Sequence, residues 1–179
     1  MKFTPAGIDG AFEIDLERRT DDRGFFARAW CEGEFAQHGL STRIAQVNVG
    51  TSTKAGTLRG MHYQLAPHAE AKLVRCGRGA VYDVAVDLRP ESATFRRWHG
   101  CELSAGNGRM LYVPEGCAHG YLTLADDTEL TYFASVPYPP GAARGVRHDD
   151  PAFAIRWPGP VKVISPADAS WPAFKETQA

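Results

Sequence analysis

Two stretches of the chain decide the fold: residues 56–77, GTLRGMHYQLAPHAEAKLVRCG, and residues 108–119, GRMLYVPEGCAH. In the first, a glycine is followed by His62, Gln64 and Glu70, and a second glycine ends the stretch. In the second, a glycine is followed by a Pro-Glu-Gly turn and His119. Apolar runs on either side of these turns predict pairs of strands. Side chains of adjacent barrel strands point inward alternately, so we expect the polar residues to meet in one cavity.

The remainder of the chain also predicts an all-β fold. From about residue 44 onward, short apolar or alternating runs recur about every 8–14 residues, a spacing that favours a sandwich or barrel over alternating strands and helices. The turns between them draw on 18 glycines and 12 prolines. The expected strands are residues 43–49, 57–64, 71–76, 80–88, 95–103, 109–113, 120–123 and 129–135.

One short helix and an irregular tail complete the expected domain, which spans residues 1–179. The helix is expected over residues 32–38, with Phe35 facing inward and Gly39 as its C-cap. Residues 157–179 contain four of the 12 prolines and are expected to be irregular. Three aromatic side chains of this tail should pack on the barrel: Trp157, Trp171 and Phe174.

The composition narrows the classes of function. With 20 basic and 21 acidic residues, the formal net charge is −1, which argues against the broad basic face that nucleic acids or membranes require. No stretch approaches the roughly 20 apolar residues of a membrane-spanning helix, and the N-terminus has no basic and apolar leader. The four cysteines are widely spaced without a CxxC pair, which argues against a zinc ribbon or redox motif. We therefore expect a cytoplasmic protein with reduced thiols.

The two stretches resemble the paired signature motifs of the cupin superfamily, which implies a cupin-type jelly-roll β-barrel. Most cupins hold a metal at these positions, so His62, Glu70 and His119 could form a three-ligand site. Gln64, however, replaces the second histidine of the motif, and a neutral amide oxygen is a poor ligand for a transition metal. We therefore expect neither a metal nor another cofactor. A metal-dependent cupin oxygenase or isomerase is the alternative, and a purely structural role for these polar residues is another.

Further matches along the chain lie at residues 22–26, 46, 48, 56–64, 72–76, 82–87, 114–120, 132, 144–147 and 149–151. Together they resemble one family, the dTDP-4-dehydrorhamnose 3,5-epimerases, which are metal-independent cupins of nucleotide-sugar biosynthesis. The resemblance implies that the substrate is a nucleoside-diphosphate 4-keto-6-deoxyhexose, as in rhamnose-type polysaccharide pathways. Its C3 and C5 hydrogens are acidified by the ketone, so inversion at C3, C5 or both needs a base, an enolate stabiliser and an acid.

The resemblance implies four catalytic residues. His62 is the base, and Asp168 orients its imidazole, with Asp83 as a second candidate for that role. Lys72 holds its ammonium near the developing enolate oxygen. Tyr132 returns a proton from the opposite face. A non-catalytic binding module is a further class of function, but mere binding does not require a base, a cation and an acid around one cavity.

The resemblance also implies residues that bind the substrate. Arg23, Arg59 and His119 match positions that hold the diphosphate, where a guanidinium can form forked hydrogen bonds. The other expected substrate-binding residues are Phe26, Arg28, Gln46, Asn48 and Tyr138.

Three departures from the family pattern bear on the nucleotide. Arg28 stands where family members usually have a glutamate that accepts from thymine N3–H, Val47 replaces an aspartate, and His148 replaces a tryptophan. An arginine offers only donors, which suit cytosine or guanine better than thymine N3. The substrate is therefore expected to carry dTDP or, as the alternative, CDP or GDP.

Family members generally pair through extended N-terminal strands, so the resemblance implies a homodimer. Residues 12–16, FEIDL, alternate apolar and acidic side chains, as an edge or exchanged strand should. The same pattern also fits an ordinary edge strand within one subunit.

Overall fold

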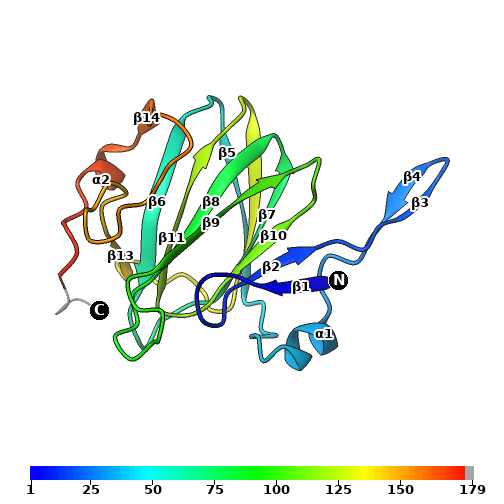
Figure 1. Ribbon diagram of the computed structural model, residues 1–179, viewed down its shortest axis with the longest axis horizontal. Helices are drawn as coiled ribbons and strands as arrows, with labels where there is room; N and C mark the ends of the chain where they lie inside the picture. Colours follow the sequence, from blue (N-terminus) through cyan, green and yellow to red (C-terminus); the bar gives the residue numbers. More distant parts are fainter. Residues whose placement is uncertain (176–179) are drawn as a thin grey trace.

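The computed structural model describes residues 1–175, which fold into fourteen strands and two short helices. Two six-stranded sheets face each other and form the body of the molecule (Figure 1). The first sheet has the order β1 (Lys2–Pro5), β2 (Phe12–Asp15), β10 (Met110–Val113), β7 (Lys72–Arg78), β12 (Thr128–Ala134) and β5 (Gln46–Ser52). The second has the order β13 (Ala143–Gly145), β6 (Thr57–Gln64), β11 (Cys117–Thr123), β8 (Ala80–Asp87) and β9 (Trp98–Ser104), with β14 (Val163–Ile164) beside β6. The prediction of an all-β fold is confirmed.

Three apolar clusters hold the sheets together. One fills the space between the sheets and contains Val74, Leu111 and Leu130 from the first sheet and Val81 and Leu103 from the second. A second cluster covers the outer face of the second sheet beneath the C-terminal segment, and a third covers the outer face of the first sheet beneath α1 (Glu32–Gln37). Strands β8 and β10 are largely apolar along their whole length, because each contributes side chains both to the cluster between the sheets and to an outer cluster.

The sequence located the barrel strands well, with differences of a few residues at their ends. The strand at residues 57–64 was predicted with the observed bounds. The strand expected at residues 95–103 begins instead at Trp98, because residues 94–97 form a turn in which Arg96 takes a positive φ of 64°. The predicted helix ends one residue early, with Phe35 buried and Gly39 at a φ of +69°.

The expectation of an irregular tail was wrong at two places. Residues 166–169 form helix α2 (Pro166–Ala169), and β14 pairs with β6. The helix begins at a proline, and Ser165 caps it by accepting a hydrogen bond from the Asp168 N–H at 3.0 Å, a favoured start for a helix. Trp157 and Phe174 pack on the outer cluster of the second sheet as predicted. The last residues of the predicted tail, 176–179, lie outside the described residues.

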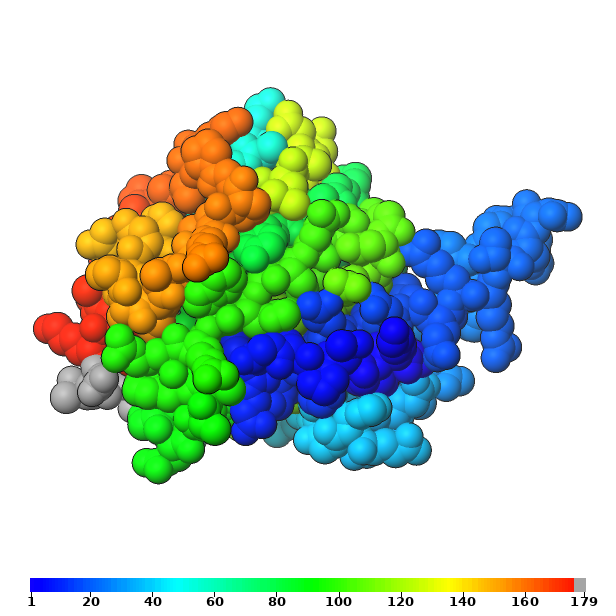
Figure 2. Space-filling view, viewed as in Figure 1, coloured from blue at the N-terminus to red at the C-terminus, as the bar shows by residue number. Residues whose placement is uncertain are grey.

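An N-terminal hairpin was not predicted from the sequence. Strands β3 (Arg19–Asp21) and β4 (Gly24–Phe26) form a two-stranded sheet of their own, which stands out from the body as an arm (Figures 1 and 2). The segment expected as an edge or exchanged strand, residues 12–16, instead contributes β2, which lies inside the first sheet between β1 and β10. Among residues 1–175, no helix is long and apolar enough to cross a membrane.

Candidate active site

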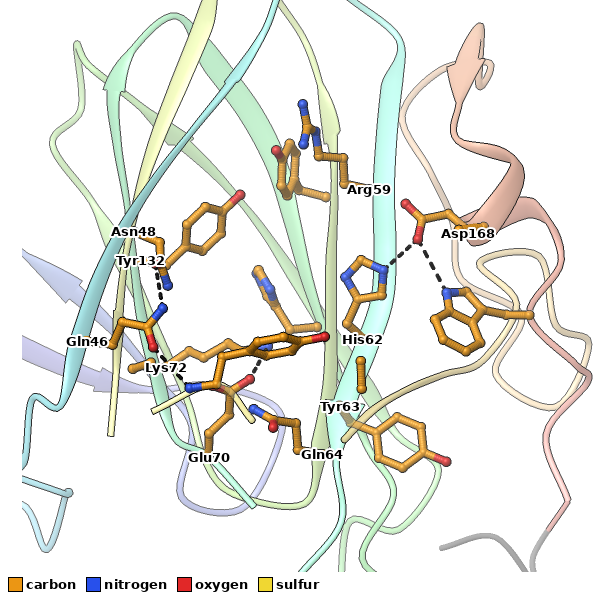
Figure 3. A pocket seen from close by; sticks show the side chains of 17 residues that line it. Gln46, Asn48, Arg59, His62, Tyr63, Gln64, Glu70, Lys72, Tyr132 and Asp168 are labelled. Atoms are coloured by element: carbon orange, nitrogen blue, oxygen red, sulfur yellow. Dashed lines mark hydrogen bonds and ion pairs between the residues drawn. The ribbon is translucent and has the colours of Figure 1, made fainter. Parts of the chain in front are cut away.

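A cavity of about 580 Å³ opens between the two sheets, and polar side chains from both sheets line it (Figure 3). Strands β6 and β11 of the second sheet supply one wall, and β5, β7 and β12 of the first supply the other. Helix α2 closes one side. Of the residues expected at a catalytic or binding site, those that line this cavity are Gln46, Asn48, Arg59, His62, Lys72, His119, Tyr132, Tyr138 and Asp168.

A local irregularity in β6 lets Arg59 and His62 face the same cavity. Side chains three residues apart point to opposite faces of a regular strand. Here His62 pairs with His119, whereas Arg59 pairs with Tyr121, so β6 has one residue more than β11 between these two pairs. Such a bulge redirects side chains. Gly60 permits it, because its φ is +138° and a Cβ atom would lie 2.6 Å from the backbone of β11.

His62 and Asp168 form a close pair at the cavity wall. His62 Nε2 lies 2.6 Å from Asp168 Oδ1 (Figure 3). The backbone N–H of Gly60 donates to Asp168 Oδ2 at 3.4 Å, so both carboxylate oxygens are engaged. Asp83, the second candidate for orienting His62, lies 2.9 Å from His119 Nε2 instead. The pair leaves Nδ1 of His62 directed into the cavity.

The surroundings of His62 favour its neutral form. Burial lowers the pKa of the imidazole below its ordinary 6.5, and the charge of Asp168 opposes this shift without cancelling it. The nearby Lys72 and His119 lower the pKa further. The side chain keeps 40% of its surface exposed toward the cavity, so a bound ligand would desolvate it more. With Nε2–H donated to Asp168, Nδ1 carries the lone pair that can accept a proton.

Lys72 and Tyr132 lie on the opposite sheet. The ammonium of Lys72 pairs with Glu70 at 2.9 Å, and both side chains are largely buried. Burial, with smaller contributions from Tyr121 and Asp83, raises the pKa of the Tyr132 phenol far above its ordinary value. This shift favours the protonated phenol, which can donate its proton to a strong base such as a carbanion.

Hydrogen bonds hold several polar side chains of the cavity in place. Gln46 Nε2 donates to Asn48 Oδ1 at 2.8 Å, and Gln46 Oε1 accepts from the Tyr138 N–H at 3.0 Å. Arg59 is held by a 2.7 Å hydrogen bond from Nη2 to the carbonyl of Thr51. These contacts place an amide, a phenol ring and a guanidinium around one opening.

The cupin-type metal site considered from the sequence does not assemble. His62 contacts Asp168, Glu70 contacts Lys72, and His119 contacts Asp83, so each candidate ligand has a separate partner. Gln64 lines the cavity with 4% exposure, and its amide makes no hydrogen bond within residues 1–175. Within residues 1–175, Glu13, His99 and Cys101 do place three potential ligand atoms within 4.8 Å of one another. None of these three residues lines the cavity.

Three expected substrate-binding residues lie away from this cavity. Arg23 is at the tip of the hairpin, where it pairs with Asp21. Phe26 is the last residue of β4 and is exposed. Arg28 pairs with Glu34 of α1 at 2.8 Å. The cavity residues that were not expected at the site include Tyr121 and Trp171. Tyr121 could have been found, since it lies two residues after His119 on the same strand.

The chain is similar in sequence to a family of known enzymes. The sequence pattern of the family described as dTDP-4-dehydrorhamnose 3,5-epimerase matches residues 5–176. A dTDP-4-dehydrorhamnose 3,5-epimerase of Sinorhizobium fredii is 44% identical, covering 98% of this chain and 91% of the relative. A dTDP-4-dehydrorhamnose 3-epimerase of Streptomyces niveus is 40% identical, covering 94% of this chain and 81% of the relative.

A solved structure extends the likeness to three dimensions. The 3,5-epimerase of Bacillus anthracis, crystallised with TDP and PPi bound, superposes with a TM-score of 0.92 at 38% identity and covers 97% of this chain and 99% of its own. The predicted cupin-type jelly-roll barrel is confirmed, as is the predicted resemblance to this group of enzymes. The chain belongs to the dTDP-4-dehydrorhamnose 3,5-epimerase family.

Proposed function

We propose that the protein is a cofactor-independent isomerase that inverts C3 and C5 of a dTDP-4-keto-6-deoxyhexose. The observation that carries this proposal is the arrangement of one cavity: a neutral His62 with its carboxylate partner on one sheet, and a protonated Tyr132 with Lys72 on the other. Removal and return of a proton on opposite faces of a carbon inverts it. The two sheets supply the two faces.

In the proposed reaction, His62 Nδ1 takes the proton from the carbon beside the ketone. The electron pair of the C–H bond moves to the C4 oxygen, which becomes an enolate. Asp168 keeps the imidazole in the required tautomer and stabilises the imidazolium that forms. The lowered pKa of His62 ensures that the imidazole is unprotonated near neutral pH.

Lys72 and Tyr132 complete the cycle. The largely buried Lys72 ammonium faces the enolate oxygen, and a fixed charge in such a position stabilises more than it does in solution. Tyr132 Oη then gives its proton to the carbon from the opposite face. Solvent returns a proton to Tyr132 and removes one from His62, so no net proton is consumed. Repetition at the second carbon gives the doubly inverted sugar.

The nucleotide of the proposed substrate is dTDP. The Bacillus anthracis relative was crystallised with TDP, and the Streptomyces niveus relative is named for a dTDP sugar. A free guanidinium at Arg28 would favour CDP or GDP, but the guanidinium pairs with Glu34. Neither this alternative nor the metal-dependent oxygenase or isomerase is favoured by the relatives.

We also propose a homodimer in which the hairpin of one subunit reaches the cavity of its partner. The hairpin exposes Phe25 and Phe26 at 50% and 73%, and β5, at the edge of the first sheet, exposes Val47 and Val49 at 51% and 64%. Burying these four side chains against each other would remove a large apolar surface from water. It would also bring Arg23 beside a cavity that needs a cation for the diphosphate.

We further propose a cytoplasmic location. The four cysteines form no disulfide, as in a reducing compartment.

Turnover of a nucleotide panel tests the proposed substrate. The purified protein is incubated with dTDP-, UDP-, CDP- and GDP-4-keto-6-deoxyhexoses, and the sugar configuration is followed by proton NMR. We expect the dTDP sugar to be converted with the highest kcat/KM. Faster conversion of a CDP or GDP sugar would restore the alternative nucleotide, and no conversion of any of the four would refute the epimerase proposal.

A further inference from the structure

Trp171 contacts both His62 and Asp168, although it has no role in the proposed reaction. Its indole Nε1–H donates to Asp168 Oδ1 at 3.3 Å. The same oxygen binds His62 Nε2 at 2.6 Å. The indole also meets the imidazole edge to face, with ring centroids 6.1 Å apart and an interplanar angle of 73°. One side chain therefore contacts both members of the pair.

The local fold fixes this position of Trp171. Helix α2 ends at Ala169, and Trp171 follows two residues later. Its ring lies against Gly145 of β13, where a Cβ atom would overlap the indole. Gly145 is the register partner of His62, so the absence of a side chain at residue 145 opens the space beside the imidazole that the indole fills.

We propose that Trp171 is a positioning residue for the His62–Asp168 pair. Its N–H fixes the carboxylate oxygen that holds the imidazole, and its ring shields the pair from water. Only the catalytic consequence rests on the proposed epimerase function. The contacts themselves concern the free protein.

Both contacts favour the neutral imidazole. An oxygen that already accepts from the indole is a weaker acceptor for an imidazolium, and a shielded site disfavours the charged form. Burial is the largest cause of the lowered pKa of His62. Other charged groups face His62 from other elements: Lys72 of β7, paired with Glu70, and His119 of β11, paired with Asp83. Arg59 on the same strand lines the same cavity. None of them contacts the indole through a hydrogen bond within residues 1–175, so a change at residue 171 acts through Asp168 and shielding.

The Trp171→Phe variant separates the two contacts, because phenylalanine keeps an aromatic ring and loses the N–H. The titration of His62 is followed by NMR in the free protein labelled with ¹⁵N-histidine. We expect the pKa of His62 to rise by about 0.5 unit, since an unshared carboxylate binds the imidazolium more strongly. The acid limb of kcat/KM should move to higher pH by the same amount. The matched control is Trp157→Phe, whose indole donates to the carbonyl of His148 at 2.9 Å and which should change neither measurement.

A second measurement needs no variant. In unmodified protein labelled with ¹⁵N-tryptophan, the Nε1–H resonance of Trp171 should titrate with the midpoint of His62, while that of Trp157 should not. An unchanged His62 pKa in Trp171→Phe, or a Trp171 resonance that ignores the titration, would overturn the proposal. Because both NMR titrations omit substrate, a positive result in a protein that does not epimerise would refute the proposed function and leave the role of Trp171 standing.

Discussion

Replacing Tyr132 with phenylalanine should separate proton removal from inversion. The phenol is the proposed acid, and its raised pKa favours the protonated form that an acid requires. The centroid of the Tyr132 ring lies 6.2 Å from that of His119 and 6.4 Å from that of Tyr121. Phenylalanine keeps these ring contacts, so the variant should fold. Loss of a positioned acid costs about 10²–10⁴ in rate, which corresponds to about 3–5 kcal/mol of activation free energy.

The assay is epimerisation in D₂O followed by proton NMR of the recovered sugar. Tyr132→Phe should still allow some hydrogen exchange, because His62 can remove a proton and return a deuteron to the same face, while inversion falls by the stated factor. His62→Ala should show no exchange at either carbon. Tyr82→Phe makes the same change outside the cavity, where Tyr82 packs on the outer cluster, and should behave as the unmodified protein. Full inversion by Tyr132→Phe would refute the reasoning, because another group would then be the acid.

Four further predictions follow from the same site. Asp168→Asn removes a charge that raises the pKa of His62. We expect kcat/KM to fall by about 10²–10⁴ and its acid limb to move to lower pH. The control Asp149→Asn, at the surface, should change neither. In the unmodified protein, kcat/KM should rise with pH through a pKa below 6.5, because only neutral His62 accepts a proton, and Tyr132 should cause no alkaline fall near pH 10; an acid limb centred above 6.5 would contradict this account of the base. Exhaustive chelation should leave activity intact, since His62, Glu70 and His119 each have another partner, and activity that is lost and then restored by one divalent ion would establish a metal enzyme. Mixing Arg23→Ala with Lys72→Ala subunits should recover up to about a quarter of full activity if the hairpin acts on the partner cavity of a dimer, because half of the dimers are then mixed and each has one intact cavity. No recovery after subunit exchange would contradict this role of the hairpin.

The sequence predicted the barrel and most of the cavity because both depend on short-range patterns. The strand at residues 57–64 is bounded by a glycine and by a proline-containing turn, and its bounds were correct. His62 and Gln64 are two residues apart, so regular alternation alone puts them on one face. The bulge that brings Arg59 to that face is not visible in an alternation pattern. It is recognisable only from the pairing of β6 with β11.

The hairpin and the tail show where prediction from the sequence stopped. Arg23 and Phe26 match a family motif, but no local pattern indicates that they stand on an arm remote from their own cavity. Ser165 and Pro166 form a recognisable helix start, which could have predicted α2. The contact of Trp171 with His62 required three-dimensional structure, because His62 and Gly145, against which the indole lies, belong to strands distant in the sequence.

The central claim is that this cavity removes and returns protons at carbons beside a sugar ketone. The direct measurement is incubation of chelator-treated protein with dTDP-4-keto-6-deoxyglucose in D₂O, with the product examined by mass spectrometry and proton NMR. The account predicts one deuterium at C3 and one at C5, with both centres inverted. A sugar recovered without deuterium at either carbon would contradict it.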